Sequence, residues 1–585
     1  MNIIIIMKFR KFILLFAIAL ISILLYFSFS NRKFDNNTVK ADNITKDMPS
    51  LLTDPFLQLP TDNSVNVVWF TEFPGDNNWV LYGDELENKV TATTTKLSRV
   101  REDAESKLEP GYEQLTSRDI WRHEATITGL NPDTRVPYQV VSVKDGETIG
   151  SQQFTLTSAP QPDTPLNILL TSDHQLMPMT AANLQKVVET VGEIDAVFLA
   201  GDLVNIPDRA SEWFDDSRGG AFFPGLQGKA NYELEKDGVT TTYKGGAIIQ
   251  SAPLFTALGN HEVMGRYSTE KPLNRQFYDA VPRTKTSTSI TSDITKVKNN
   301  SFNTDTYEEI FTLPQSESGG EQYYAVTFGD VRLVVLYVTN IWRFPELNGD
   351  LPSRYAESPT DFNNPVNWGY GQHIFEPIEK GSQQYQWLKS ELQSEAFRTA
   401  KYKVVMFHHP PHTLGGNIVP PYTNPQQNID RDANNEVQAI TYSYPKEEDY
   451  IIRDLIPLLD AAGVQLVYYG HSHLWNRFQS PSGMHFLESS NVGNSYGAHT
   501  ADNPRNVPPN DLDNIAVGNP NGLEPIVPNI YPIEDEKGQP LPYIASNDLT
   551  VFSILNTEEG TVSSYRFDTR KPNSKVIKFD EFKLK

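Results

Sequence analysis

The chain has 585 residues, with 73 acidic against 50 basic side chains, a formal charge of −23 and no cysteine. Disulfides and thiolate metal sites are therefore excluded, and any metal must be held by His, Asp, Glu, Asn or Tyr. An acidic surface repels phosphate backbones, so a nucleic-acid duplex is not expected as a partner; anionic substrates would be repelled too, unless bound cations reverse the local field. The length predicts two to four domains.

The N-terminal segment has the pattern of an export signal. Lys8, Arg10 and Lys11 precede an apolar run at 12–29. A run of this length is about the minimum for a membrane span, which favours an uncleaved anchor over a cleaved peptide. We expect residues 1–30 to be a signal anchor or signal peptide. The rest of the chain is then extracytoplasmic, either secreted or attached to the membrane through this segment.

A polar linker at 31–50 leads into a region with the signals of short strands. Turn residues separate these strands, and no helical period is present between 51 and 160. The pattern predicts an all-β sandwich, expected to act as a spacer and packing partner. The expected strands lie at 65–69, 79–83, 123–130, 138–143 and 151–158.

After a Pro-rich segment at 158–165, the pattern changes to apolar strands that alternate with helices, and this region runs from 165 to 585. It predicts an α/β domain with a largely buried sheet. Strands are expected at 167–171, 196–200, 253–258, 402–407, 464–469, 549–556 and 562–568, with a hairpin at 323–338; helices are expected at 180–192, 382–395 and 447–462. Long polar intervals at 206–250, 280–320, 340–380 and 413–446 are expected to be loop insertions, which are commonly functional at this length.

Polar side chains gather where five of these strands end. They are Asp173; Asp202; Asn260, His261 and Glu262; His408 and His409; and His471 and His473. Ligands of α/β sheets bind beyond the carboxyl ends of the strands, and divalent metals prefer carboxylate, amide and imidazole ligands. Two cations about 3.5–4 Å apart can stabilise the attacking and leaving oxygens of a phosphoryl displacement, and an imidazole can protonate the leaving group.

Five segments resemble the sequence blocks of calcineurin-like metallophosphoesterases. They are SDHQ (172–175), AGDLVN (200–205), ALGNHE (257–262), VVMFHHPPH (404–412) and YYGHSHLWNR (468–477). Within this superfamily the chain is most similar to purple acid phosphatases, and the segment at 123–143 resembles the end of their N-terminal domain. The resemblance implies an α/β fold: a metallophosphoesterase β-sandwich flanked by helices, preceded by an all-β fibronectin type III-like domain.

The resemblance also implies a role for each site residue. Six residues would hold two divalent or mixed-valence metal ions (Fe, Mn or Zn): Asp173, Asp202, Asn260, His408, His471 and His473. Asp202 would bridge the ions, Asp173 and His473 would complete the first position, and the other three would form the second. A metal-bound hydroxide would attack phosphorus, with His261 as proton donor or transition-state stabiliser and Glu262 orienting it.

Two positions depart from the family pattern. Many members have His two residues after the first Asp, where this chain has Gln175, and purple acid phosphatases have a metal-binding Tyr where this chain has Asn205. Gln175 or Asn205 could supply an amide oxygen, or His174 could turn toward the metal. Without the tyrosinate we expect no purple charge-transfer band and a weaker preference for Fe(III).

The expected activity is hydrolysis of small phosphate monoesters. The same metals could hydrolyse phosphodiesters of nucleotides or lipid head groups, and the sequence hardly separates the two activities. A third alternative is a non-catalytic surface protein stabilised by metal, supported only by the departures at Gln175 and Asn205. The presence of His261 argues against it, because a structural metal site needs no proton donor. His409 and His412 could be structural or could contact substrate.

Overall fold

The computed structural model describes residues 50–266, 270–279, 294–339, 356–365, 368, 376–412, 414, 422–496, 524–525 and 543–585. The expected export signal and linker lie outside these residues. Ser50–Lys585 forms one compact unit. Among the described residues, no helix is both long and apolar enough to cross a membrane.

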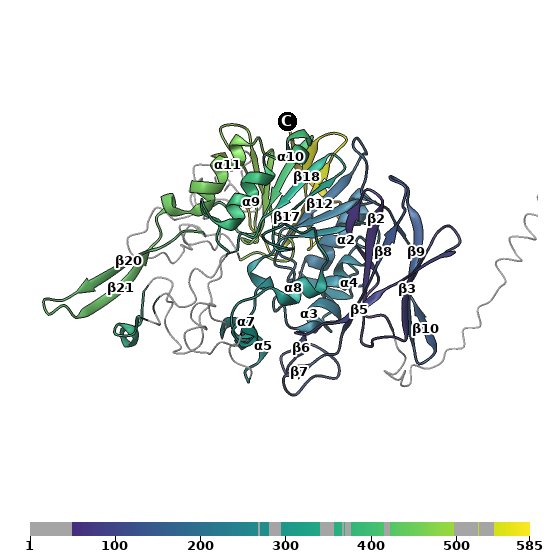
Figure 1. Ribbon diagram of the computed structural model, residues 1–585, viewed down its shortest axis with the longest axis horizontal. Helices are drawn as coiled ribbons and strands as arrows, with labels where there is room; N and C mark the ends of the chain where they lie inside the picture. The colour runs from purple at the N-terminus through teal and green to yellow at the C-terminus, as the bar shows by residue number, and fades with distance from the viewer. Residues whose placement is uncertain are drawn as a thin grey trace, which may run out of the picture. The chain divides into compact units, whose positions relative to one another are not determined.

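The N-terminal part is a sandwich of two antiparallel sheets, which confirms the expected all-β region (Figure 1). One sheet has the order β1 (Phe56–Thr61), β2 (Ser64–Thr71), β8 (Trp121–Thr128) and β5 (Thr93–Lys96). The other has the order β10 (Glu147–Gly150), β9 (Val136–Lys144), β3 (Asn77–Tyr82) and β4 (Asn88–Thr91), with β11 (Phe154–Leu156) also paired to β9. Val65, Val67 and Trp69 alternate along β2 and share a buried cluster with Val80 and Tyr138 of the facing sheet.

Between β5 and β8 the chain leaves the sandwich in a long excursion, residues 97–120. It contains the short pair β6 (Arg101–Glu102) and β7 (Thr116–Ser117). Figure 1 shows this pair beside α3 (Ala210–Phe214) of the larger part of the chain. Backbone contact is direct, because the N–H of Arg101 donates to the carbonyl of Asp208 at 2.8 Å.

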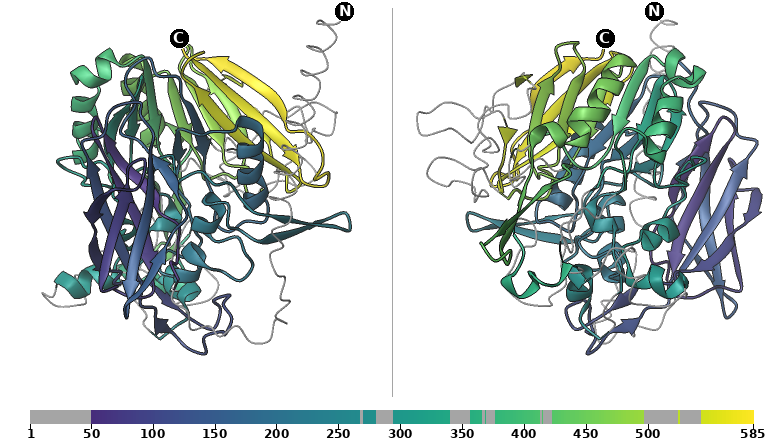
Figure 2. Two further views of the ribbon diagram at one scale, coloured as in Figure 1. Left: turned by 90° about the vertical axis from the view of Figure 1, so that its right-hand side faces the viewer. Right: turned by 60° about the vertical axis from the view of Figure 1, so that its left-hand side comes forward.

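The larger part contains two sheets. The first has the order β16 (Leu254–Thr256), β13 (Ala196–Leu199), β12 (Asn167–Thr171), β27 (Leu549–Asn556), β28 (Thr561–Asp568) and β29 (Ile577–Lys583). The second has the order β17 (Tyr324–Phe328), β18 (Val331–Val335), β19 (Tyr402–Met406), β22 (Leu466–Tyr469), β24 (His485–Ser489), β23 (Trp475–Gln479) and β25 (Glu524–Pro525), with β26 (Tyr543–Ile544) paired to β23. Figure 2 shows the yellow C-terminal strands of the first sheet beside green strands of the second.

The side chains of the second sheet are divided between two hydrophobic clusters. Val404 and Met406 join the main core with the first sheet, whereas Val405 belongs to a second cluster that includes Leu388 and Leu459. Both faces of the strand are therefore covered by apolar residues. This explains why β19 and β22 of this sheet are nearly continuous apolar runs in the sequence.

Nine α-helices lie in the described part of the chain. They are α2 (Thr180–Val191), α3, α4 (Phe222–Leu226), α5 (Leu273–Asp279), α7 (Ile294–Asn300), α8 (Asp305–Ile310), α9 (Gln383–Glu391), α10 (Glu395–Thr399) and α11 (Ile456–Ala461). The expected helix at 447–462 is present as a continuous helical segment, with a π register over Ile451–Leu455 that passes directly into α11, after a 3₁₀ turn at Lys446–Glu448. Pro457 in the first turn of α11 has no N–H to donate to the preceding turn, which fits the change of register there.

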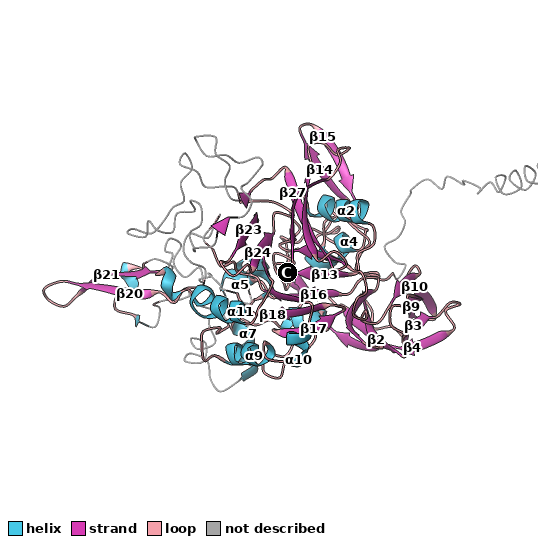
Figure 3. Ribbon diagram, turned by 90° about the horizontal axis from the view of Figure 1, so that it is seen from above, coloured by secondary structure: helices cyan, strands magenta, loops and turns pink. Residues whose placement is uncertain are grey.

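Two intervals expected to be loop insertions contain β-hairpins: β14 (Tyr232–Lys236) with β15 (Val239–Tyr243), and β20 (Gln426–Arg431) with β21 (Val437–Ser443). Figure 3 shows both pairs extending outward. Apolar and polar residues alternate over a short part of each hairpin, at Tyr232 and Leu234 of β14 and at Ile440 and Tyr442 of β21, but the rest of each hairpin is largely polar. The first hairpin did carry a local signal, because Asp237 and Gly238 form its two-residue turn with φ of 50° and 76°. The third C-terminal strand, β29, was also not expected.

Candidate metal centre

The six predicted metal ligands and His261 follow strands of both sheets of the larger part. Asp173 follows β12, Asp202 follows β13 and Asn260 follows β16, all in the first sheet. His408 follows β19, and His471 with His473 follows β22, in the second sheet. These strands are parallel within each sheet. The site therefore forms where the carboxyl ends of two sheets meet, rather than at the edge of one open sheet.

The backbone at these strand ends is strained. Four of the predicted ligands have a positive φ: Asp173 at 56°, Asp202 at 57°, His471 at 80° and His473 at 53°. Non-glycine residues in this region carry a conformational cost, and such positions cluster at functional sites. Gly201 is required for a second reason. Its φ is 95°, and a Cβ there would lie 2.7 Å from the nitrogen of Gly259 and 2.8 Å from Nδ1 of His408.

Asn260, His408 and His471 converge on Asp202. His408 Nε2 lies 3.1 Å from Asn260 Oδ1 and 3.2 Å from Asp202 Oδ2. His471 Nδ1 lies 3.0 Å from Asn260 Oδ1 and 3.3 Å from His408 Nε2. These separations suit donor atoms that share one cation.

Asp173 and His473 form a second group on the other side of the strand ends. His473 Nε2 lies 3.4 Å from Asp173 Oδ1. The Asp173 carboxylate also accepts the backbone N–H of His471 at 3.0 Å, which ties the two sheets together. Ligand atoms of Asp173, Asp202 and His408 lie within 4.8 Å of one another, so the two groups adjoin through Asp202.

The donor set fits a pair of cations. Asp173 and Asp202 are 0% and 2% exposed, and within the described ranges neither forms an ion pair with lysine or arginine. Burial raises the pKa of Asp202, but the positive charges of His408 and His261 lower it more. The pKa of Asp202 is therefore below its usual range. Burial lowers the pKa of His408, but Asp202 more than compensates and raises it to about 9. Bound cations would supply the positive charge that these buried carboxylates need.

Residues outside the predicted set orient the imidazoles. The Nδ1 of His408 hydrogen bonds with the carbonyl of Ala200 at 2.7 Å, and Nδ1 of His473 with Oδ1 of Asn494 at 2.6 Å. Each bond directs Nε2 toward the carboxylates. Buried Glu488 accepts the backbone N–H of Ser472 at 2.9 Å, between His471 and His473. Sequence patterns did not indicate Asn494 or Glu488, because nothing local marks a partner that folding brings from another strand or loop.

Glu262 anchors two loops of the site. Its carboxylate accepts the backbone N–H groups of Asp202, Leu203 and Gly259 at 2.9, 2.8 and 2.7 Å. Burial and the neighbouring charge of Asp202 raise the pKa of Glu262 to about 8. Its role in orienting His261 stays a prediction.

His261 is held by the carbonyl of Asn205, which bonds its Nδ1 at 2.7 Å. Its backbone N–H donates to Asp202 Oδ1 at 2.9 Å, and its ring stacks on Phe277 with centroids 5.2 Å apart. Because the Asn205 carbonyl is an acceptor, this contact places a proton on Nδ1 of His261.

His409 and His412 are both buried, and the ligand atoms of His409, His408 and His471 lie within 4.8 Å of one another, close enough to hold one ion. The His409 ring stacks on His471 at 3.9 Å, and burial with the charges of His471 and His408 holds its pKa well below the ordinary value. His412 Nε2 bonds with Glu488 at 3.0 Å. Arg477 forms a bidentate ion pair with Asp580 of β29, at 2.7 and 2.9 Å, so it braces the core.

A pocket of about 700 Å³ adjoins His261 and Asn205. Polar and charged residues dominate its lining: Glu105, Lys107, Arg209, Glu212, Asp216, Arg218 and Asn274 contribute, with Ala104, Ile206, Phe277 and Tyr278. Ala104, Glu105 and Lys107 belong to the excursion from the N-terminal sandwich. The sandwich therefore supplies one wall of the pocket, which the expected role of a spacer did not include.

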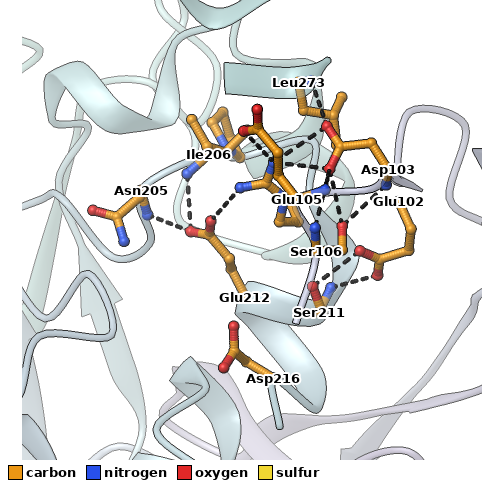
Figure 4. A network of polar contacts seen from close by, with 12 residues as sticks. Glu102, Asp103, Glu105, Ser106, Asn205, Ile206, Ser211, Glu212, Asp216 and Leu273 are labelled. Atoms are coloured by element: carbon orange, nitrogen blue, oxygen red, sulfur yellow. Dashed lines mark hydrogen bonds and ion pairs between the residues drawn. The ribbon is translucent and has the colours of Figure 1, made fainter. Parts of the chain in front are cut away.

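A buried network joins this wall to Asn205 (Figure 4). Asp103 accepts the backbone N–H of Leu273 at 2.6 Å and binds Arg209 at 3.1 Å. Arg209 donates to Glu212 Oε1 at 3.1 Å, and Glu212 Oε2 accepts the N–H of Asn205 at 2.7 Å. The carbonyl of Asn205 is the one that holds His261.

Comparisons with known proteins agree with this architecture. The sequence model of the calcineurin-like phosphoesterase family matches residues 166–474, and that of the purple acid phosphatase N-terminal domain matches residues 53–158. Among solved structures, the chain is similar to the purple acid phosphatase PPD1 from yellow lupin (Lupinus luteus) seeds. The identity is 14%, the TM-score is 0.50, and the match covers 90% of this chain and 73% of the lupin chain. At this identity the likeness shows a shared fold. No curated protein matches at a significant level.

Proposed function

This chain belongs to the calcineurin-like phosphoesterase family and is a metal-dependent phosphoric ester hydrolase, and on that premise we propose that it hydrolyses small phosphate monoesters with two metal ions. One observation carries the proposal. Two buried carboxylates, an amide oxygen and three imidazoles meet at the ends of strands from two sheets, beside a His held by its Nδ1. A metal kept only for stability would not need that His.

Each residue has a distinct part in this proposal. Asp202 bridges the two metal positions; Asp173 and His473 complete the first; Asn260, His408 and His471 complete the second. Fe(II), Mn(II) and Zn(II) all accept such ligands. Asn205 stands where purple acid phosphatases have tyrosine, so the metal-loaded protein is expected to lack a strong visible absorption band.

When bound, the two ions supply positive charge for the phosphoryl oxygens and lower the pKa of a coordinated water. The chain supplies the rest. His261 gives its Nε2 proton to the leaving oxygen or to a phosphoryl oxygen in the transition state, while the Asn205 carbonyl keeps Nδ1 protonated. Phe277 holds the ring in plane for this transfer.

The pocket beside His261 supports a hydrophilic leaving group. Its lining is rich in charged groups, and its polar character suits a sugar or amino alcohol better than an acyl chain. Its volume also leaves room for a second ester arm, which keeps hydrolysis of small phosphodiesters as the second candidate.

We also propose that the enzyme works outside the cytoplasm. The basic flank and the apolar run at 12–29 support this location. Fractionation of cells expressing the full chain should recover the protein in the membrane or medium, accessible to protease added outside. Recovery only in the cytoplasm would contradict this location without affecting the catalytic proposal.

The catalytic proposal is tested with the full chain, chelated and then reloaded with Mn, Fe or Zn. We expect turnover of p-nitrophenyl phosphate that depends on added metal and exceeds turnover of bis(p-nitrophenyl) phosphate. Asp202→Asn should abolish it and His261→Ala should lower kcat by about 10²–10⁴-fold. Asp163→Asn is the matched control, because this exposed residue also has a positive φ (65°) but lies outside the site. Faster diester turnover would select the second candidate, and no turnover of folded, metal-loaded protein would reject both.

A further inference from the structure

Position 175 lies two residues after Asp173, where many related enzymes place a metal-binding His. The sequence left three side chains that could fill the first metal position: His174, Gln175 and Asn205. The structure separates them by what each side chain already contacts.

His174 is directed into the protein core. Its Nε2 bonds with Thr171 Oγ1 at 2.9 Å, and its ring packs on Phe222 with centroids 6.1 Å apart. Phe222 belongs to the main hydrophobic cluster. Its Nδ1 also has no hydrogen-bond partner among the described residues, but Thr171 and Phe222 hold the ring, and reaching the metal would require His174 to leave both contacts.

Asn205 is occupied by its neighbours. Its Nδ2 donates to the backbone carbonyl of Gln175 at 2.5 Å, and its own carbonyl holds His261. Glu212 accepts its backbone N–H. Asn205 therefore braces the backbone of Gln175 and orients His261.

Gln175 has the features of an unused ligand. Its side chain is 1% exposed, and its Oε1 has no hydrogen-bond partner among the described residues. A buried amide oxygen without a donor is unfavourable, and such atoms in native structures commonly mark an ion or water site. The backbone is held in place by the bond from its N–H to the Leu203 carbonyl at 3.0 Å, with a φ of 40°.

The amide lies at ligand distance from the bridging carboxylate. Gln175 Nε2 is 3.3 Å from Asp202 Oδ2. Two ligand atoms at right angles on one cation, with bonds of about 2.1 Å, are about 3 Å apart. Rotating the Gln175 amide by 180° exchanges Nε2 and Oε1, which are nearly equal in size. Oε1 then lies where Nε2 is now, about 3.3 Å from Asp202 Oδ2.

We propose that Gln175 donates its side-chain Oε1 to the metal ion held by Asp173, Asp202 and His473. This inference rests on the proposed two-metal function. The first position then has three oxygen ligands and one imidazole, whereas the second has two imidazoles. Oxygen ligands suit Mn(II) better than Zn(II), so the two positions prefer different metals.

The test measures metal binding rather than turnover. Full-length chelated protein and its variants are titrated with Mn²⁺, and the free ion is followed by electron paramagnetic resonance. We expect two equivalents to bind the wild type. Gln175→Leu, which keeps the volume but removes the oxygen, should bind one equivalent as before and the other about tenfold more weakly or worse. Gln175→Glu should still bind two equivalents of Mn²⁺. In Gln175→His, the first metal position should prefer Zn²⁺ when Mn²⁺ and Zn²⁺ compete.

The thermal stability of the chelated variants separates a ligand from a structural residue. As a ligand, Gln175→Leu should lose less stability without metal than with it, because without metal it removes only the unpartnered Oε1 and the 3.3 Å bond from Nε2 to Asp202. A loss of stability in chelator equal to the loss with metal would overturn the proposal. So would two unchanged Mn²⁺ equivalents in Gln175→Leu. If the wild type itself binds fewer than two equivalents of Mn²⁺, the proposed two-metal function is wrong, whatever the role of Gln175. Asp202→Asn shows the Mn²⁺ binding expected when the bridging carboxylate is lost.

Discussion

At the scale of single residues, Glu262 shows how one side chain can hold two loops. Its two carboxylate oxygens accept N–H groups from the loop after β13 and from the loop after β16. Both loops carry predicted metal ligands. Glu262 therefore fixes the positions of Asp202 and Asn260 through backbone hydrogen bonds, although it is not one of the predicted metal ligands.

We predict that Glu262→Ala lowers the free energy of unfolding by roughly 2–4 kcal/mol, because three buried N–H groups lose their acceptor. Urea unfolding of the chelated protein measures this loss without a contribution from metal. Glu262→Gln keeps one acceptor oxygen and should lose less. Equal stability of wild type and Glu262→Ala would contradict the anchoring role.

His123 in β8 supplies a prediction about pH. Its ring nitrogens bond with Thr71 and Thr94 at 2.7 and 2.9 Å, and burial lowers its pKa from 6.5 to about 4. The unfolded chain therefore holds more protons than the folded chain between these values, so stability falls as pH drops through that window. The full loss is roughly 3 kcal/mol.

The measurement is the melting temperature of wild type and His123→Gln from pH 7 to pH 4. Wild type should lose more stability than the variant on acidification, since the glutamine does not titrate. Metal effects are common to both proteins and cancel in the difference. Parallel curves would show that His123 does not contribute.

At the scale of elements, the excursion between β5 and β8 lines the pocket beside His261, where we propose that the substrate binds. It provides three residues of the pocket wall and, through Asp103, one end of the network that reaches Asn205. Asp103 also accepts the first N–H of α5, the helix that carries Phe277. Both supports of His261 thus depend on the N-terminal sandwich.

We predict that Asp103→Ala lowers kcat by about tenfold, because Arg209 loses a buried partner and Glu212 no longer holds Asn205 in place. Steady-state kinetics with p-nitrophenyl phosphate at fixed metal would measure it. Asp119→Ala is the control: this exposed carboxylate of the same excursion pairs with Lys96 at 2.7 Å, does not line the pocket and should matter little. Equal effects of the two substitutions would contradict a specific role of Asp103.

At the scale of the whole molecule, the sandwich and the larger part share one hydrophobic core. Phe70 of β2 lies 5.0 Å from Phe214 and 5.5 Å from Phe223, and Phe56 of β1 lies 5.0 Å from Phe223. All belong to the main cluster that also contains the two sheets of the larger part. The two parts are therefore expected to unfold together.

We predict one calorimetric unfolding transition for metal-free protein. Phe70→Ala should lower its midpoint as a whole, with a cost of about 3–5 kcal/mol, because it leaves a cavity between the parts. Val80→Ala is the reference variant, because it makes a cavity inside the core of the sandwich, away from the interface that contains Phe70. Two separate transitions in wild type would show that the parts are independent.

The sequence was most informative where structure is local. The strand signals around 167–171, 196–200 and 402–407 were confirmed, because each is a short apolar run with its own turn residues. The helix expected at 447–462 was confirmed over 451–461, but its π register at Ile451–Leu455 was not predicted, and neither were the two hairpins. Helix register and strand pairing depend on backbone hydrogen bonds, which hydrophobic periodicity does not report.

The sequence by itself determined the family, the fold class and the set of candidate site residues, because each site residue stands beside the strand or turn that places it. Only the tertiary structure decided how those residues are supported. Glu488, Asn494 and the Asp103 network reach the site from distant parts of the chain. Their roles depend on which surfaces pack together, and packing is a property of the whole folded chain rather than of any segment.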